Sequence, residues 1–170
     1  IVLGLFGLTS FAYDVKTYIP KNAITYLPVV KKEQLRLWSD HPMPEIIPGL
    51  IEQESCLSLT HSRCWNPESR LDTKREFGQG FGQITKAFKQ DGSIRFDALQ
   101  ELKKKHKELS EWRWANNAIR PDVQIAGLIL MNKDNYKALY AIKDPIVRFH
   151  FADAGYNGGV GGVNSDRRLC

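Results

Sequence analysis

The sequence has little that would hold the chain in a membrane. The nearly apolar stretch Ile1 to Ala12 is too short to span a bilayer. It fits the apolar region of a signal peptide, with Ser10 and Ala12 as small residues before a cleavage point, although the usual basic start is missing. We therefore expect residues 1–13 to be the remnant of a signal peptide whose true start lies upstream. The protein would then be exported to the periplasm, cell wall or medium and would meet the membrane only through this leader. A buried helix packed on the domain is the alternative.

Cysteine is scarce, with only three in 170 residues. Cys56 and Cys64 flank a short polar loop, and in an oxidising compartment they are placed to close a disulfide that pins it. Cys170 is left over, so we expect its partner in a missing C-terminal piece. Cys56, His61 and Cys64 are also metal-ligand types, but three ligands without a fourth make a poor structural zinc site. We expect the disulfide and no metal.

Motifs for nucleotides and nucleic acids are missing as well. Glycines alternate across residues 78–82, but no Lys-Ser or Lys-Thr pair follows as a phosphate-binding loop requires. The formal net charge of +5, from 24 basic and 19 acidic residues, favours an anionic polymer such as bacterial cell wall. The one basic run, Lys103 to Lys107, lies among leucines at helical spacing after a capping pair, Asp97 and Gln100, and is explained as a solvated helix face. We expect no nucleic-acid partner.

The chain is long enough for one core and too short for two comfortable domains. Residues 14–42 are rich in proline and predict an N-terminal arm with one helix, at residues 31–38. Residues 43–170 form the main domain. Within it, Pro121 to Met131 is apolar nearly all round and predicts the central helix of the core. Asp144-Pro145 should cap a later helix ending near Ala154, before a run of glycines. The expected fold is mainly α, with at most a small β element.

Glu54 is the most informative side chain. It lies four residues after Leu50 and three after Ile51, so it falls within the apolar stripe of a helix that starts near Ile46. Glu52 is turned about 160° away and should face solvent. A carboxyl held against apolar groups has a raised pKa and can stay protonated as a general acid, which glycosidic bond cleavage requires. Pairing with a buried arginine, or capping of a neighbouring helix, is the structural alternative.

Three motifs follow one another along the chain: Glu54-Ser55, then GFGQIT from Gly80 to Thr85, then AGYNGG from Ala154 to Gly159. With the helical stretch Pro121 to Leu130 between the last two, this order resembles the soluble lytic transglycosylase family, which has a lysozyme-like fold. The resemblance covers about two thirds of the chain. It implies one catalytic acid and base, and a set of residues that bind the substrate: Glu54 is the acid and base, and Ser55, Gln83, Ile84, Tyr156 and Asn157 line the site.

The resemblance also implies a reaction and a substrate. The enzyme would cleave the β-1,4 bond between N-acetylmuramic acid and N-acetylglucosamine in peptidoglycan strands, leaving a 1,6-anhydro end, with no cofactor. Three features depart from the family pattern: a long cysteine-bearing insertion, Cys56 to Glu76, the pair Phe81-Gly82 before the glutamine, and an extra glycine, Gly155, just before Tyr156. The loop bordering the substrate is therefore expected to differ. We expect a monomer.

Two other functions remain open. A hydrolase of the same bond would need a second carboxylate to position water, and the insertion offers three: Glu68, Asp72 and Glu76. A wall-binding protein would keep the groove that binds the glycan strand but would have weak or no catalytic activity. Trp112 and Trp114 are either sugar-stacking platforms or packing residues. A phage lysis or virion enzyme and a bacterial secretion-machine enzyme are both compatible with this sequence.

Overall fold

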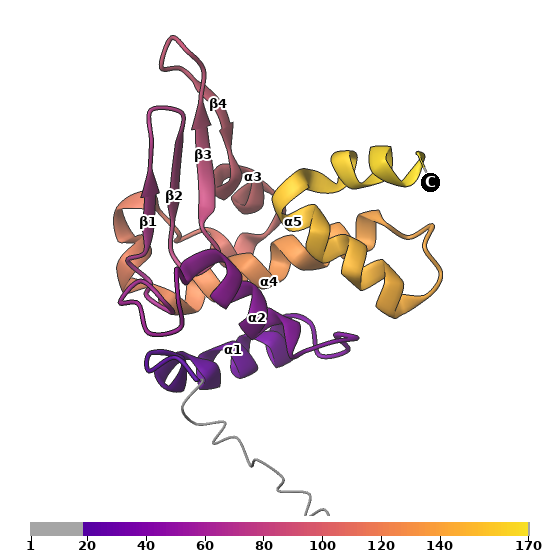
Figure 1. Cartoon of the computed structure of the whole chain (residues 1–170), viewed down its shortest axis with the longest axis horizontal. Helices are drawn as coiled ribbons and strands as arrows, with labels where there is room; N and C mark the ends of the chain where they lie inside the picture. Colours follow the sequence, from indigo (N-terminus) through magenta and orange to yellow (C-terminus); the bar gives the residue numbers. More distant parts are fainter. Residues whose placement is uncertain (1–18, 170) are drawn as a thin grey trace, which may run out of the picture.

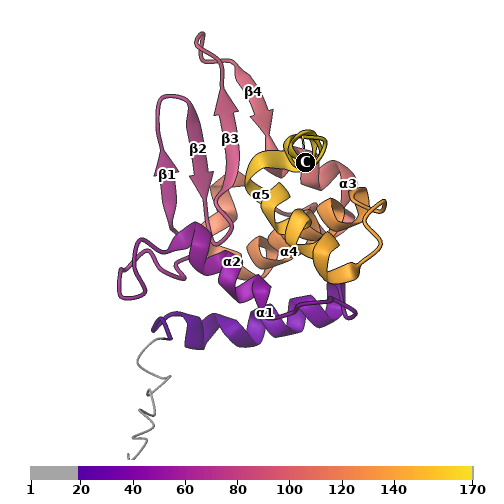
Figure 2. The same cartoon turned by 45° about the vertical axis from the view of Figure 1, so that its right-hand side comes forward.

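The computed structural model describes residues 19–169, and within them the chain is mainly α-helical with one four-stranded antiparallel sheet. In Figure 1 helix α4 runs across the middle, α1 and α2 lie below it, and the sheet rises above them on one side. Figure 2 shows the same order, with α5 beside the base of the sheet. The fold class expected from the sequence is confirmed at this level. The expectations for residues 1–13 and for Cys170 lie outside the described residues.

Helices α1 (Ala23–Leu37) and α2 (Ile46–Ser55) pack side by side under α4. The predicted helix at 31–38 was too short, because α1 already begins at Ala23 and carries Pro28 inside it. Pro28 removes one backbone donor, but Val30 and Trp38 are buried in the same core as α2 and α4. Burial of this face outweighs the proline, and the arm is part of the domain core.

Helix α4 (Pro121–Ala138) is the centre of the protein, as its apolar sequence predicted. Nine of its residues are buried, and six of these belong to two hydrophobic clusters. One cluster joins α4 to α1 and α2, and the other joins it to α3 (Ala98–Lys105) and two short 3-10 helices, η2 (Lys107–Leu109) and η3 (Trp114–Ile119). Because both clusters meet on one helix, the elements around α4 hold fixed positions relative to one another.

The sheet has the order β1–β2–β3–β4, with strands Arg70–Asp72, Glu76–Gln79, Ile84–Phe88 and Ile94–Asp97. All neighbours are antiparallel, with Glu76 opposite Ala87 and Ala87 opposite Phe96. Within the insertion Cys56 to Glu76 lie β1 and the first residue of β2, and the two strands pair as a small β-hairpin at the edge of the sheet. Asp97 ends β4 and caps α3, accepting a hydrogen bond from the backbone of Gln100 as expected.

Helix α5 (Pro145–Arg167) starts at the cap expected from Asp144, whose side chain accepts from the backbone N–H of Val147 at 2.8 Å. The predicted end near Ala154 is wrong. The helix continues to a break at Gly159, which has φ 68° and ψ 150°, and then resumes. The resumed part is held by Val163, which is buried in a cluster with Leu139, Ile142 and Ala152. This packing overrides the poor helix propensity of the glycines.

The loop from Cys56 to Ser69 is tied back to α2. A disulfide joins Cys56 to Cys64, with an S–S distance of 1.99 Å, as the spacing predicted. Cys64 and Trp65 are buried in the main core. The loop thus lies against the helix that carries Glu54.

Candidate active site

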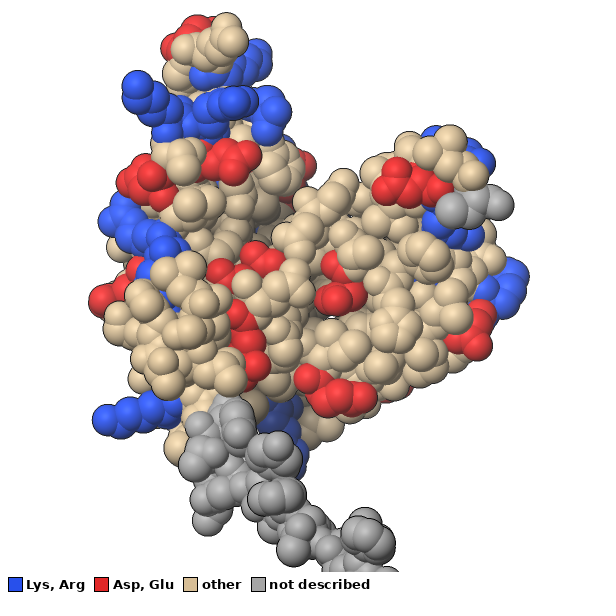
Figure 3. All heavy atoms as spheres, in the orientation of Figure 1, with Lys and Arg blue, Asp and Glu red and all other residues tan. Residues whose placement is uncertain are grey.

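A cleft of about 520 Å³ separates the helices from the sheet, and Glu54 lies in its wall at the last turn of α2. Figure 3 shows a hollow between the sheet side and the helical side of the molecule, with acidic groups near it. The helical wall carries Glu54, Met131, Tyr156 and Asn157, and the sheet wall carries Glu76, Gln83, Ile84, Thr85, Ala87 and Phe96. Of the six site residues predicted from the sequence, five line this cleft.

Glu54 is half-buried, and burial raises the pKa of its carboxyl above the ordinary value. The negative charge of Asp153 raises it further, while the nearby side-chain amides of Asn157 and Gln53 lower it. Desolvation is the largest of these effects, as the apolar stripe of α2 predicted. The site can therefore hold a protonated carboxyl facing a cleft.

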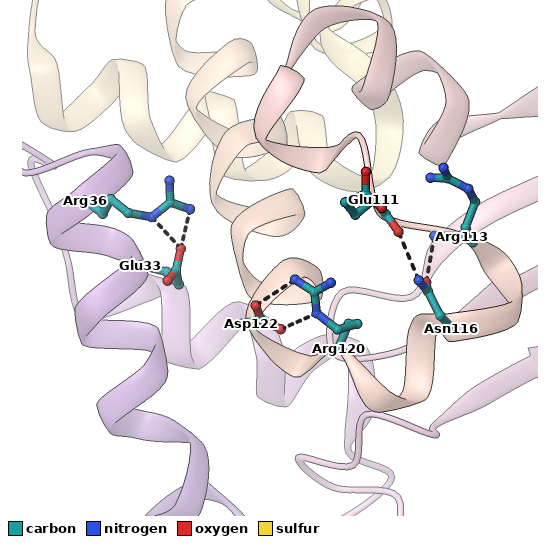
Figure 4. A network of polar contacts seen from close by, with 7 residues as sticks. All are labelled: Glu33, Arg36, Glu111, Arg113, Asn116, Arg120 and Asp122. Atoms are coloured by element: carbon teal, nitrogen blue, oxygen red, sulfur yellow. Dashed lines mark hydrogen bonds and ion pairs between the residues drawn. The ribbon is translucent and has the colours of Figure 1, made fainter.

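Glu33 is a carboxylate with a structural role and serves as a comparison for Glu54. It is buried on α1, and Arg36 donates to its Oε2 from Nε at 2.9 Å (Figure 4). Asp122 is likewise paired with Arg120 at the start of α4. Glu54 has no ion-pair partner in the range 19–169. The structural alternative, a glutamate paired with a buried arginine, therefore does not describe Glu54.

Two residues of α5 approach Glu54. Asn157 lines the same cleft as Glu54, and its side-chain amide lowers the pKa of the Glu54 carboxyl. Asp153, one helical turn earlier, was missed by the sequence reasoning. It is half-buried, its Oδ1 is buried without a hydrogen-bond partner among the described residues, and burial raises its pKa. The spacing of Asp153, Tyr156 and Asn157 on one helix face was the signal that could have identified it.

Tyr156 closes the cleft from the helical side. Its side chain is 8% exposed, and its hydroxyl donates to the backbone carbonyl of Gly82 at 2.7 Å. A Cβ at Gly82 would overlap this hydroxyl, so the close approach requires glycine there. Burial raises the pKa of Tyr156, and the negative charges of Glu54 and Asp153 raise it further. The tyrosine therefore stays neutral and joins α5 to the β2–β3 turn.

The β2–β3 turn holds the other motif residues. Gln83 lines the cleft, but its Nε2 donates to the carbonyls of Ser69 at 3.1 Å and Gly80 at 2.8 Å. Its amide thus fixes the turn rather than offering both donors to a sugar. Gly80 has φ 85°, and a Cβ there would overlap Gln124, whose Oε1 accepts from the backbone of Phe81. Ile84 is 3% exposed and forms part of the cleft floor.

Two expectations about α2 need correction. Ser55 does not line the cleft. It is 3% exposed, and its Oγ donates to the carbonyl of Ile51 at 2.6 Å and accepts from the backbone of Trp65 at 3.1 Å. Glu52 is half-buried rather than turned to solvent, and it accepts from Nε1 of Trp65 at 3.3 Å. Both side chains hold the disulfide loop against the helix, a long-range contact that helical periodicity does not predict.

Both tryptophans considered as sugar platforms are packing residues. Trp112 is fully buried and donates from Nε1 to Oδ1 of Asn117 at 2.5 Å. Trp114 packs edge-on against Phe77 and beneath Lys86. Neither lines the cleft. The basic run behaves as the solvated helix face that was expected, since Lys104 pairs with Glu101 and Lys105 with Asp134.

The structure distinguishes the three carboxylates that were considered for positioning water in a hydrolase. Glu68 and Asp72 are exposed and do not line the cleft, and Asp72 lies 3.5 Å from Arg70. Glu76, at the start of β2, lines the sheet wall of the cleft that contains Glu54. It is therefore the one of the three that shares a surface with the proposed acid.

Within residues 19–169 no group of three His, Cys, Asp or Glu side chains is placed to hold a metal ion. In the same range, no helix has the length and apolar character needed to cross a bilayer. Comparison with protein-family models, with curated proteins and with solved structures found no match.

Proposed function

We propose that the protein is a peptidoglycan lytic transglycosylase with a lysozyme-like fold and Glu54 as its general acid and base. The observation that carries this proposal is a carboxyl with a raised pKa, facing a cleft, without an ion-pair partner in the described part of the chain. A cleft walled on one side by helices and on the other by a small antiparallel sheet suits an extended glycan strand. The sequence resemblance to the family supplies the substrate.

In the first step the Glu54 carboxyl gives its proton to the oxygen that joins N-acetylmuramic acid to N-acetylglucosamine, and the bond from that oxygen to C1 breaks. The substrate's own acetamido group stabilises the positive charge that develops at C1. Asn157, which lines the cleft beside Glu54, is placed to orient the carboxyl. A second protein carboxylate is not required for this step.

In the second step the Glu54 carboxylate takes the proton of the 6-hydroxyl of the muramic acid. The 6-oxygen then bonds to C1, which closes the 1,6-anhydro ring and returns Glu54 to its protonated form. No water enters the products, and no cofactor is needed. Desolvation of Glu54 favours the protonated state with which the next cycle begins.

One observation favours a second candidate, a hydrolase of the same bond. Glu76 lies in the opposite wall of the cleft and is chemically suited to position a water molecule against C1. The two reactions leave different ends, anhydro for the transglycosylase and reducing for the hydrolase. Mass spectrometry of muropeptides released from purified peptidoglycan separates them. No release at all would favour a wall-binding protein.

The proposal also covers the compartment in which the enzyme acts and its partner. A disulfide next to the site fits an exported protein that acts in the periplasm, in the cell wall or outside the cell. The partner would be a glycan strand, which one monomer can bind. A phage lysis or virion enzyme and a bacterial secretion-machine enzyme both meet these conditions.

A further inference from the structure

The sheet contains a β-bulge beside the cleft. Ala87 of β3 lies opposite Phe96, and the next residue, Phe88, lies opposite Ile94, so Arg95 is an extra residue in β4. Neighbouring residues of a regular strand point to opposite faces, but a bulge re-aims the side chains at its position. As a result, Arg95 and Phe96 both line the cleft.

A side pocket of about 240 Å³ adjoins the cleft at this bulge. Thr73, Arg75, Glu76, Phe88 and Arg95 line it, and it shares Glu76 and Arg95 with the main cleft. Arg75 precedes β2 at the β1–β2 turn, and its carbonyl accepts from the backbone of Phe88. One arginine from the β1–β2 turn and one from β4 thus line one small space that adjoins the main cleft.

The two arginines differ from others near the cleft in having no polar partner. Arg63 donates to Oγ of Ser69 and to the carbonyl of Arg70, and Arg70 forms an ion pair with Asp72. The guanidinium groups of Arg75 and Arg95 make no hydrogen bond and no ion pair within the range 19–169. Figure 3 shows Lys and Arg side chains gathered at the outer end of the sheet. The side pocket is therefore the part of this basic end of the sheet that adjoins the main cleft.

We propose that this side pocket binds a carboxylate of the peptide stem carried by the muramic acid, so that the protein acts on peptide-bearing rather than bare glycan. The proposal rests on the proposed function. Arginine guanidinium groups bind carboxylates with paired, charge-assisted hydrogen bonds. A glycan strand in the main cleft would project its peptides sideways, and the pocket lies beside the cleft. Glu76 at the shared edge suits the amino group that a diamino acid residue of the stem carries.

The test compares two substrates: purified peptidoglycan with its peptides, and the same strands after an amidase has removed them. The bare strands keep a carboxylate on each lactyl group, so they also test whether the pocket binds that group instead. We expect the unmodified protein to cleave peptide-bearing strands about tenfold faster, the scale of one charge-assisted hydrogen-bonded pair. The ratio of the two rates should fall about tenfold in Arg75→Gln and in Arg95→Gln. Lys74→Gln and Lys89→Gln, on the same end of the sheet but outside the pocket, should keep the ratio.

Two results would overturn the proposal. One is an equal fractional loss on both substrates in the arginine variants, because that indicates general attraction to the strand. The other is a preference of the unmodified protein for bare strands, because that assigns the pocket to the lactyl carboxylate. Failure of the proposed function is recognised separately, as no cleavage of either substrate. In that case co-sedimentation of the full chain with the two preparations measures the same ratio as binding.

Discussion

The hydroxyl of Tyr156 donates to the carbonyl oxygen of Gly82 at 2.7 Å, in a buried contact that closes the cleft. This contact joins the helix that carries Asn157 to the glycine-rich turn that carries Gln83. Two motifs that lie 74 residues apart in sequence are thus one structural unit. The sequence resemblance assigned the hydroxyl to the substrate, and the structure instead assigns its proton to the protein backbone.

Tyr156→Phe is expected to destabilise the protein by about 1–3 kcal/mol, because it leaves a buried carbonyl without its donor. Gly82→Ala should also destabilise, since its Cβ would overlap the hydroxyl. The double variant should lose less than the sum of the two single losses, because removing the hydroxyl makes room for the methyl group. Urea unfolding of the four proteins measures this coupling. Strictly additive losses would mean that the two residues do not meet.

Glu54→Gln should lower wall lysis by at least about a hundredfold, because the amide cannot donate the required proton. Glu52→Gln is the matched control on the same helix. The glutamine keeps a side-chain oxygen that can accept the hydrogen bond from Nε1 of Trp65, so both folding and lysis should stay near normal. Turbidity clearing of purified cell wall measures lysis, and circular dichroism checks the fold. Similar losses in the two variants would remove the basis for assigning Glu54.

Because folding raises the pKa of Glu54, the stability of the folded protein should depend on pH, and the direction of the change can be predicted. A glutamate in the unfolded chain has a pKa of about 4.3, and above this pH the folded protein binds more protons at Glu54 than the unfolded chain does. The stability that the protonated carboxyl contributes is therefore lost as pH rises through the pKa of the folded protein. Glu54→Gln should therefore gain stability relative to the unmodified protein as pH rises from 4 to 7. Thermal unfolding at several pH values tests this. A constant difference between the two proteins, or one that changes in the opposite direction, would contradict a raised pKa.

The disulfide between Cys56 and Cys64 should contribute about 2 to 3 kcal/mol by constraining the unfolded chain. A double change to alanine is expected to lower the free energy of unfolding by that amount and to loosen the loop beside Glu54. Peptide mapping without reduction identifies the bond directly in exported protein. Two free thiols in that map would be the contrary result.

Local sequence patterns were sufficient for several elements. The apolar stripe placed Glu54 correctly on α2, and Asp97 and Asp144 cap the helices that they were expected to cap. These features depend on residues within one or two helical turns. They could be predicted because the interaction and the sequence signal occupy the same short segment.

Features that depend on distant contacts were missed. Glu52 and Ser55 hold Trp65, ten or more residues away. Helix α5 continues past its glycines because Val163 packs in a cluster with Leu139, Ile142 and Ala152. The bulge that turns Arg95 toward the cleft depends on strand register, which a single strand does not reveal. The effect of Asp153 depends on Glu54, which lies on another helix, and its spacing from Tyr156 and Asn157 was the local sign of its place at the site.

The products of digestion test the central claim most directly. Purified peptidoglycan should be incubated with the unmodified protein, with Glu54→Gln and with Glu76→Gln, and the released muropeptides identified by mass spectrometry. We predict 1,6-anhydro muramic acid ends from the unmodified protein, almost no release by Glu54→Gln, and anhydro ends still formed by Glu76→Gln. Mainly reducing ends from the unmodified protein, with release abolished in Glu76→Gln, would contradict the account and identify a hydrolase.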